Sequence, residues 1–436
     1  MKQNLLPHRL LPQDSGEQSL WADTEVPDIE TPELTGSHKV DVLVVGGGFT
    51  GLSCALHLAQ QGAAVMLLEA KNFGFGGSGR NAGLVNAGVW QTPEYVEQQL
   101  GKEAGERFNL ALRDSPELVF ELIQKYQIEC DAERTGTINI AHRASALDYL
   151  ENRFRQIQDR GSEVELLNAE QSESLSGSPL YCHGGILDPN AGTIQPLNYA
   201  RGLARAAAGQ GAKLFQRVPL RSLERVGSQW QAKTRDAIVT AHNVVIATNA
   251  YSDEYCSGVK QSAVPMFIFH CATQPLDAEV AAGIVPQRHG IWDTRLLLTS
   301  SRIDGSNRLL MSSAGPLHGF QKLIRQDWMK RLRNRLYPQT RGVEWSYHWS
   351  GQVGLTSNKL LRVQELAPGL IAPAGYNGRG IGPGTVIGQQ LADLLITNNR
   401  KEFPFPIQPL RREAWLAVKA AYYEYGTLAL QLVDQR

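Results

Sequence analysis

The chain has 436 residues, of which 42% are hydrophobic and 20% charged, and 43 basic residues balance 43 acidic ones. This length exceeds what a single hydrophobic core usually organises, so two domains are expected. The balanced charge offers no basis for binding nucleic acid or an acidic membrane surface, and the apolar runs fall far short of the ~20 residues that span a bilayer.

Cysteine usage and the N-terminal sequence indicate the cellular compartment of the protein. The first residues contain no uninterrupted apolar stretch of the kind found in secretory signals. No CxxC spacing occurs, so neither a disulfide framework nor a zinc site is predicted, and no metal is expected. Reduced thiols favour a cytoplasmic protein. The five cysteines are Cys54, Cys130, Cys182, Cys256 and Cys271.

Residues 1–38 are rich in Pro, Glu and Thr without a clear period, and we expect them to form an extended N-terminal arm. A buried strand is then predicted from Lys39 to Val45, followed by a turn, a helix and a second strand that ends at Glu69. This order of elements is typical of a dinucleotide-binding unit.

The turn Gly46-x-Gly48-x-x-Gly51 has the spacing that such a unit requires. Gly46 permits the tight turn, Gly48 lets the backbone approach a pyrophosphate, and Gly51 lets the helix pack on the strand. The N-terminus of the helix offers N–H groups to the phosphates. Glu69 follows Gly51 by 18 residues and is expected to accept hydrogen bonds from a ribose with a free 2′-OH, which disfavours NADP.

A second glycine-rich stretch, "GFGGSGRNAGLVNAG" (74–88), contains six glycines together with Ser78, Arg80 and Asn81. It is predicted to be a loop that brings the backbone against a flat or charged group. A nicotinamide dehydrogenase does not need such a loop directly after the ribose carboxylate. A protein that binds FAD contacts it along its whole length, from the pyrophosphate to the ring, so this loop favours FAD.

The following segments differ in their secondary structure pattern. Residues 92–165 are predicted to be mostly helical, and a second αβ passage begins at Pro196 with a helix that Gly211 ends. Residues 256–349 are mostly β-rich, with one basic helix. The tail contains a Pro-punctuated linker and a last helix, which carries on one side Trp415, Val418, Tyr422 and Tyr425.

A third glycine-rich stretch, "APAGYNGRGIGPG" (372–384), directly precedes the helical sequence "TVIGQQLADLL". The helix N-terminus that it creates can face an anion and stabilise it by ~0.3–1 kcal/mol, or ~2 kcal/mol when partly buried. A reduced flavin ring carries negative charge, so a helix N-terminus at this place favours hydride acceptance.

The similar αβ passages are separated by unlike segments, which indicates a dinucleotide domain assembled from distant pieces with a second domain inserted twice. The expected FAD-binding domain comprises 39–90, 192–255 and 350–402. The expected substrate domain comprises 91–191 and 256–349. Residues 403–436 are expected to form a helical C-terminal tail.

Several stretches resemble the glycine oxidase/D-amino-acid oxidase (DAO) family of FAD-dependent amine oxidoreductases. They are the first turn with Glu69, "GGSGRNAG", "DPNAGTIQPLNYARGLARAAAGQGA", "NVVIATNAY" and "PAGYNGRGI", together with the arm "LWADTEVPDIETPELTGSHKVDV". Within that family, the chain is most similar to the gamma-glutamylputrescine oxidase group. The resemblance implies an α/β fold with a discontinuous Rossmann-like FAD-binding domain of the GR2 type, and an α+β substrate domain with a mainly antiparallel sheet.

The resemblance also implies roles for individual residues. Val218 would touch the adenine end, Ser78–Asn81 would follow the ribityl chain, and Gly378–Ile381 would contact the edge of the ring. The cofactor-binding residues that it implies are Gly46, Gly48, Phe49, Thr50, Gly51, Glu69, Ala70, Ser78, Gly79, Arg80, Asn81, Ala82, Gly83, Val218, Ala247, Thr248, Asn249, Gly375, Gly378, Arg379, Gly380 and Ile381.

Two departures from the monomeric sarcosine oxidase branch are informative. That branch tethers its flavin through a cysteine ahead of the last glycines, whereas this chain has no cysteine after Cys271, so non-covalent FAD is expected. The same branch binds the substrate carboxylate with a lysine just after those glycines. Gly382 stands at the matching position, so carboxylate binding there is unsupported.

The implied reaction transfers a hydride from the carbon next to an amine nitrogen to the flavin, and the resulting imine hydrolyses. The acceptor that reoxidises the flavin is expected to be O2, giving H2O2, although another acceptor stays open. Arg379, His348 and Arg80 are the candidate catalytic residues, and His183 and His270 are weaker candidates. The candidate pocket walls are Trp292, Phe267, Phe269, Tyr347, His348 and Trp349.

The expected substrate is a polyamine, a gamma-glutamyl polyamine or a related amine. One alternative is the oxidation of a cyclic or free amino acid such as pipecolate, a proline derivative or a D-amino acid, which requires a guanidinium in the pocket. A second is a flavin-bearing subunit that relays electrons without a substrate of its own. An NAD-dependent dehydrogenase is the remaining alternative.

Overall fold

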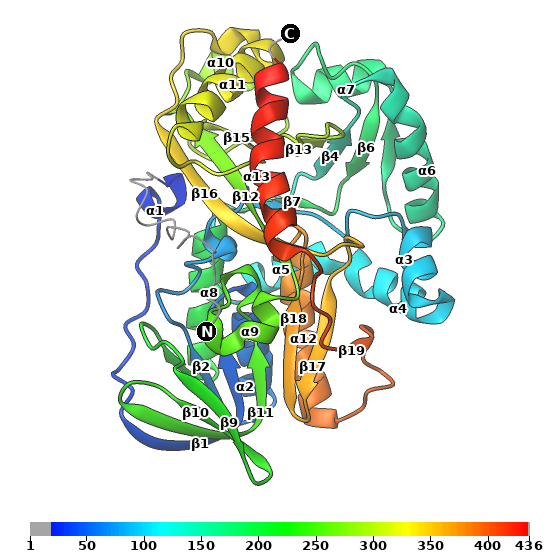
Figure 1. The fold of residues 1–436 in the computed structure, drawn as a ribbon. Helices are drawn as coiled ribbons and strands as arrows, with labels where there is room; N and C mark the ends of the chain where they lie inside the picture. Colours follow the sequence, from blue (N-terminus) through cyan, green and yellow to red (C-terminus); the bar gives the residue numbers. More distant parts are fainter. Residues whose placement is uncertain (1–18, 435–436) are drawn as a thin grey trace.

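A nine-stranded sheet forms one lobe of the computed structural model, which describes residues 19–434 (Figure 1). The strands run in the order β19–β17–β18–β11–β1–β2–β8, and the β9–β10 hairpin extends from β11. The central strands are parallel. Their bounds are β1 (Gly36–Val45), β2 (Val65–Leu68), β8 (Lys213–Phe215), β9 (Ser222–Val226), β10 (Gln229–Lys233), β11 (Ala237–Ile246), β17 (Arg362–Ala367), β18 (Leu370–Ala374) and β19 (Ile407–Pro409).

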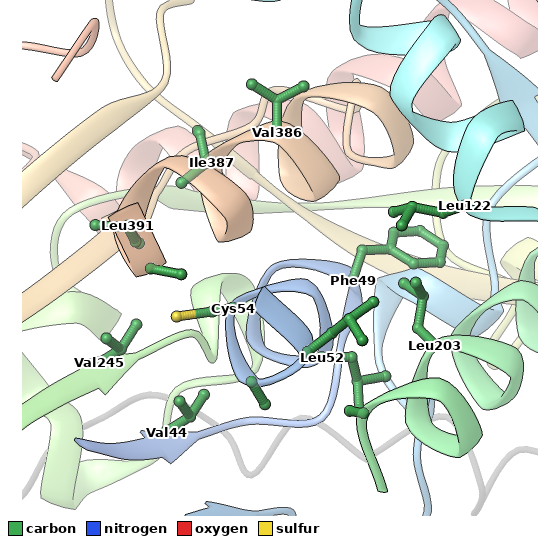
Figure 2. Close-up of a cluster of buried hydrophobic side chains, with 14 of the residues drawn as sticks. Val44, Phe49, Leu52, Cys54, Leu122, Leu203, Val245, Val386, Ile387 and Leu391 are labelled. Carbon is green, nitrogen blue, oxygen red and sulfur yellow. The ribbon is translucent and has the colours of Figure 1, made fainter. Parts of the chain in front are cut away.

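Both faces of this sheet are covered, as the continuous apolar runs of its strands require. Helices α2 (Phe49–Gln60), α8 (Pro196–Gly209) and α12 (Ile381–Thr397) cover one face. Figure 2 shows α2 at the centre of that core, between Val44 and Val245 of the strands and Leu391 of α12. The alternate side chains of the same strands pack with the hairpin residue Trp230 on the other face.

The second lobe contains an eight-stranded sheet in the order β16–β12–β15–β14–β13–β4–β6–β5 (Figure 1). All neighbouring strands are antiparallel except β13 and β4. The expected mainly antiparallel sheet is therefore confirmed. Its strands are β4 (Thr137–Ile140), β5 (Glu165–Leu167), β6 (Gly185–Asp188), β12 (Val264–Ala272), β13 (Gly290–Asp293), β14 (Ser300–Ile303), β15 (Leu309–Ala314) and β16 (Tyr347–Leu355).

The remaining elements pack around and between the two sheets. Helix α11 (Gln321–Leu336) covers one face of the second sheet with Trp328, Met329 and Leu332. No helix in the described part of the chain is both long and apolar enough to cross a membrane. The other elements are α1 (Leu20–Asp23), α3 (Pro93–Leu100), α4 (Lys102–Arg113), α5 (Ser115–Lys125), α6 (Leu147–Gln158), α7 (Ala169–Ser176), α9 (Ser257–Lys260), α10 (Ala278–Ala282), α13 (Leu416–Val433), and the paired strands β3 (Leu84–Val85) and β7 (Gly192–Thr193).

The N-terminal arm is described only from residue 19, and the part of the expected arm before it lies outside the described residues. From there Leu20 and Trp21 are buried against the second sheet. The Trp21 ring meets Trp349 edge-on at 5.7 Å, and its indole N–H donates to the backbone carbonyl of Asn81. The described part of the arm therefore ties the second glycine-rich loop to β16.

We propose that the two sheets mark the two domains expected from the sequence, with two boundaries moved. Strand β16 continues to Leu355, beyond the expected boundary after residue 349, and every residue of it pairs with β12. Strand β19 lies in the expected C-terminal tail but pairs with β17 of the first sheet. The boundaries that we propose therefore follow residues 355 and 409.

Candidate active site

A cavity of about 960 Å³ is lined by residues of both sheets. Its volume lies at the upper end of the range found for ligand and cofactor sites. The ends of β1, β2 and β11 and the first turns of α2 and α12 form one part of the wall. Strands β12, β15 and β16 and the last helix, α13, form the other.

The first glycine turn opens α2 directly onto this cavity. Gly46 has a φ of +111°, and a Cβ there would lie 3.0 Å from the Ala247 carbonyl. The N-cap residue of α2, Gly48, has no side chain to cap the helix, and the Phe49 N–H donates to Ser78 Oγ at 3.1 Å. The N-terminus of α2, with its partial positive charge, therefore offers an anion site at this turn.

Glu69, at the end of β2, lies on the cavity wall. Its Oε2 accepts from the Gly47 N–H at 2.7 Å, and its Oε1 accepts from the Lys71 N–H at 2.8 Å. Burial raises the pKa of this carboxyl, and the backbone N–H groups oppose that shift. A carboxylate has about four acceptor positions, so Glu69 can hold the turn and still accept from a ligand hydroxyl.

The second glycine-rich loop lines the cavity with Ser78, Arg80, Asn81 and Ala82. Arg80 joins the two lobes, because its Nε donates to the Phe75 carbonyl at 3.0 Å and its Nη1 to the Ser350 carbonyl of β16 at 3.1 Å. Its guanidinium also lies over the Phe75 ring. These contacts show Arg80 holding the loop in place beside the cavity.

Most of the other sequence-predicted cofactor residues also meet at this cavity. Asn249 additionally accepts from the Gly375 N–H at 2.9 Å, which links the turn after β11 to the third glycine-rich stretch. The predicted residues on the wall are Gly46, Gly48, Phe49, Thr50, Glu69, Ala70, Ser78, Arg80, Asn81, Ala82, Val218, Ala247, Thr248, Asn249, Gly378, Arg379, Gly380 and Ile381.

Four predicted glycines pack behind the wall instead of lining it. A Cβ at Gly51 would lie 2.0 Å from the Gly46 carbonyl oxygen, and one at Gly79 would lie 2.4 Å from that of Gly74. One at Gly83 would lie 2.1 Å from the Ile194 carbonyl oxygen. Gly375, with a φ of +77°, leaves room for the Thr356 methyl group. These glycines allow the close backbone approach that shapes the site.

Arg379 is the most confined charge at the cavity. It is 5% exposed, and its guanidinium carbon lies 4.6 Å from the ring centres of both Trp90 and Trp292. Nη1 donates to the Ala87 carbonyl, whereas Nε and Nη2 have no hydrogen-bond partner among residues 19–434. Burial, reinforced by the nearby Arg153, pulls the pKa of this guanidinium down. Arginine nevertheless stays charged in proteins, so Arg379 is a buried cation suited to an anionic partner.

The structure places His348 away from the cavity and His270 on it. His348 is paired with Cys271 and faces away from the cavity, and burial, with a smaller effect of Lys322, lowers its pKa. His270 lines the cavity, stacks on Trp349 at 5.1 Å and shares a 2.6 Å hydrogen bond with Ser312 Oγ. Burial, with Arg80 nearby, lowers the pKa of His270 to about 3. His270 is therefore neutral near pH 7.

Among the aromatic wall candidates, Trp292 lines the cavity. Phe267 and Phe269 occupy alternate positions of β12, and Phe269 faces Trp328 of α11. Tyr347 and Trp349 pack with the N-terminal arm. The weaker candidate His183 does not line this cavity either. The period of two along β12 turns Phe267 and Phe269 away from the cavity. Tyr347 and Trp349 share the sheet face of His270, but the arm covers them.

Sequence reasoning missed two parts of the wall. Trp90 lines the cavity, and its indole N–H donates to the Asn377 carbonyl at 2.6 Å. Helix α13 also contributes to the wall, through Tyr422, Tyr423, Gly426, Thr427 and Leu430. The apolar pattern of the tail predicted the helix but carried no signal for the surface that it covers. Among residues 19–434, no cluster of His, Cys, Asp and Glu could hold a metal ion.

Comparison with known proteins gives the same assignment over most of the chain. The family model for FAD-dependent oxidoreductases of the DAO type matches residues 41–394. Gamma-glutamylputrescine oxidoreductase of Escherichia coli (strain K12) is 30% identical over 404 residues, which cover 89% of this chain and 93% of that protein. A probable oxidoreductase of Haemophilus influenzae, OrdL, is 29% identical and covers 88% of this chain and 89% of its own.

A solved structure has a similar fold. The crystal structure of glycine oxidase from Geobacillus kaustophilus superimposes with a TM-score of 0.68 at 22% identity, covering 86% of this chain and 99% of that one. The family, the fold class and the FAD requirement predicted from the sequence are thereby confirmed. The chain belongs to the DAO family of FAD-dependent oxidoreductases, which act on amines or amino acids.

Proposed function

We propose that this protein is an FAD-dependent oxidase of a polyamine or a gamma-glutamyl polyamine, with O2 as the acceptor and H2O2 as a product. One observation carries the proposal: a single cavity runs from the glycine turn of α2 and Glu69 to an apolar wall of the second sheet. Similarity to a gamma-glutamylputrescine oxidoreductase supports the substrate class, and similarity to a glycine oxidase supports the acceptor.

The residues of the first lobe fit FAD. Two helix N-termini whose N-cap residues are glycines, Gly48 of α2 and Gly380 of α12, open on the cavity, as an elongated ligand with anionic groups requires. Glu69 would take the ribose, the Gly46–Thr50 turn the pyrophosphate, and the Gly378–Ile381 segment the ring edge. A Cβ at Gly380 would project into open space, so this part of the wall is left clear for a ligand.

FAD is proposed to be bound non-covalently. Cys256 lines the cavity, and burial, with a smaller effect of Asp253, raises the pKa of its thiol to about 12. A thiol in this state is protonated and unreactive near pH 7. Treatment with acid or denaturant should therefore release all of the flavin from the protein.

When bound, FAD supplies the acceptor for the hydride that leaves the carbon next to nitrogen. The protein must present the amine in its neutral form, although a free alkylammonium has a pKa of ~10.4. The sheet side of the cavity carries Met266 and Ile268 of β12, Trp292 of β13, and Leu297. An apolar surrounding disfavours the ammonium, and each unit by which its pKa falls corresponds to ~1.36 kcal/mol.

A second candidate is oxidation of an amino acid whose carboxylate is attached to the reacting carbon. The free nitrogens of Arg379 favour it, because they lie at the cavity and lack an anionic partner among the described residues. Gly382 offers no side chain to bind a substrate carboxylate, and there is no room for one, since a Cβ there would lie 2.6 Å from Ser115 Oγ.

Anaerobic mixing of the holoenzyme with single substrates tests the proposal. Putrescine or gamma-glutamylputrescine should bleach the visible flavin absorbance, and admission of air should restore it with release of H2O2. Bleaching by glycine or pipecolate alone would favour the second candidate. Bleaching that air does not reverse would contradict O2 as the acceptor, and a flavin that no amine bleaches would contradict amine oxidation.

A further inference from the structure

A second, smaller cavity of about 90 Å³ adjoins the first. Asn86, Trp292 and Arg379 line both cavities, so they form the partition between them. Beyond this partition the smaller cavity is lined by residues of β4, β6, α4 and α6. FAD binding does not account for the smaller cavity, because the glycine-rich turns that would hold FAD line the larger one.

Two buried side chains on the small cavity have unused hydrogen-bonding groups. Asn139 of β4 is 4% exposed, and neither its amide nitrogen nor its amide oxygen has a partner among residues 19–434. Nε and Nη2 of Arg379 are likewise unpartnered. A buried polar group without a partner costs about 1–3 kcal/mol, and a charged one costs more. The cavity is therefore suited to a polar ligand that bonds to both side chains.

The charges around the inner end of the cavity define the ligand further. Arg153 is buried there, and within the described part of the chain it donates to the backbone carbonyls of Val89, Trp90 and Gln91. Asp188 of β6 is a single carboxylate on the same wall, and burial raises its pKa while Arg379 opposes the shift. Two buried cations thus face one carboxylate.

At the outer end of the cavity, both cations are paired with carboxylates. Arg113 pairs with Asp114, and Arg160 pairs with Glu97 and Glu106. The unbalanced positive charge consequently lies at the inner end, next to the partition. A ligand carboxylate would be stabilised at that end, and a ligand ammonium would be stabilised beside Asp188.

We propose that the small cavity is a subsite for the α-amino-acid end of the amine substrate. The substrate carboxylate accepts hydrogen bonds from Arg379 and from the Asn139 amide N–H, and its ammonium group donates to Asp188. The inference rests on the proposed function, in which the reacting amine occupies the large cavity. The volume suits such a group of a few heavy atoms, given that one water occupies about 30 Å³ of the liquid.

This subsite also separates the two candidate substrates. A gamma-glutamyl polyamine carries its α-amino-acid group far from the reacting carbon, so it can reach across the partition. In a simple amino acid the carboxylate is attached to the reacting carbon, so both groups must lie in the large cavity. The subsite therefore selects substrates that have a distal zwitterionic end.

Isothermal titration calorimetry of the holoenzyme with two probes tests the subsite without turnover. L-glutamine is a gamma-glutamyl amide with the zwitterionic end, and butyramide has the same amide without that end. Wild-type protein should bind L-glutamine at least tenfold more tightly than butyramide. Asn139→Asp adds a negative charge at nearly constant volume, and Asn139→Leu removes both amide groups. Each should abolish the preference, and Asn139→Asp should leave butyramide binding unchanged, which checks its folding.

Ser178→Ala is the matched control, because it removes a buried hydroxyl that has no hydrogen-bond partner among residues 19–434 and lies outside both cavities. It should retain the tenfold preference. Equal binding of the two probes by wild-type protein would overturn the subsite, as would a preference that survives both Asn139 variants. A holoenzyme that binds L-glutamine in this way but is bleached by no amine would contradict the proposed function and leave the subsite standing.

Discussion

Glu69 holds the turn that is proposed to bind the pyrophosphate. Its two oxygens accept from Gly47 and Lys71, so the carboxylate and the turn form one unit. In Glu69→Gln only one side-chain oxygen remains to accept, and the amide NH2 opposes the second N–H. Because hydrogen bonds to charged groups contribute about 1.5–3 kcal/mol, FAD affinity should fall about tenfold or more.

Titration of the apoprotein with FAD, followed by flavin fluorescence, measures that affinity. Glu33→Gln is the control, because Glu33 is exposed on the arm. An unchanged dissociation constant in Glu69→Gln would contradict the role assigned to Glu69.

Gly51 affects the site through packing alone. Gly51→Ala places a methyl group 2.0 Å from the Gly46 carbonyl oxygen, so α2 must move away from β1. Overpacking of this kind costs about 1–3 kcal/mol, and the midpoint of thermal unfolding should fall accordingly. Gly209→Ala, at the end of α8, meets no atom within 4 Å, so it should keep the midpoint or raise it slightly through the higher helix propensity of alanine. Equal midpoints for the two variants would contradict the packing account.

At the level of secondary structure elements, the attachment of α13 depends on Glu413, just ahead of the helix. Its carboxylate is buried and accepts from Arg362, Lys419 and Ser357. Burial alone would raise its pKa, but these bonds, led by those from Ser357, lower it from 4.5 to about 2. A group with a depressed pKa stabilises the folded state above its unfolded pKa. That contribution is lost as the pH falls from about 4.5 to about 2.

Glu413→Gln should therefore lower the free energy of unfolding near pH 7 by about 2 kcal/mol, after an allowance for solvent screening beside Lys419. The difference from wild type should shrink as the pH falls from 4.5 towards 2. Denaturant unfolding at several pH values measures this difference, and hydrogen exchange should locate the loosening in α13. A difference that stays constant with pH would contradict the assignment.

The sequence predicted elements well where neighbouring residues determine them. The β1–α2–β2 unit was predicted because its strand, turn and helix are contiguous and have regular periods. The choice between His348 and His270 could not be predicted, since β12 and β16 are buried on both faces and their patterns do not tell the cavity side from the α11 side. Trp90 was missed for a similar reason, because only the fold brings it to Arg379.

At the scale of the whole molecule, FAD should stabilise both lobes together. The large cavity takes its walls from both sheets, so a ligand that fills it binds only when they are in place. A ligand present at 100 times its dissociation constant stabilises the folded state by about 2.7 kcal/mol. Removal of FAD should lower the midpoint of thermal unfolding by several degrees, and re-addition should restore it. A midpoint independent of FAD would contradict a cavity formed by both lobes.

The central claim is that one cavity joins the α2 glycine turn to the partition formed by Arg379 and Trp292, and that FAD extends along it. A crystal structure of the FAD-reconstituted protein tests this claim most directly. The account predicts the pyrophosphate against Gly46–Thr50 and the flavin ring between the first turn of α12 and the cavity face of β12. A ring on the α11 side of the second sheet, near His348, or FAD bound outside this cavity would contradict it.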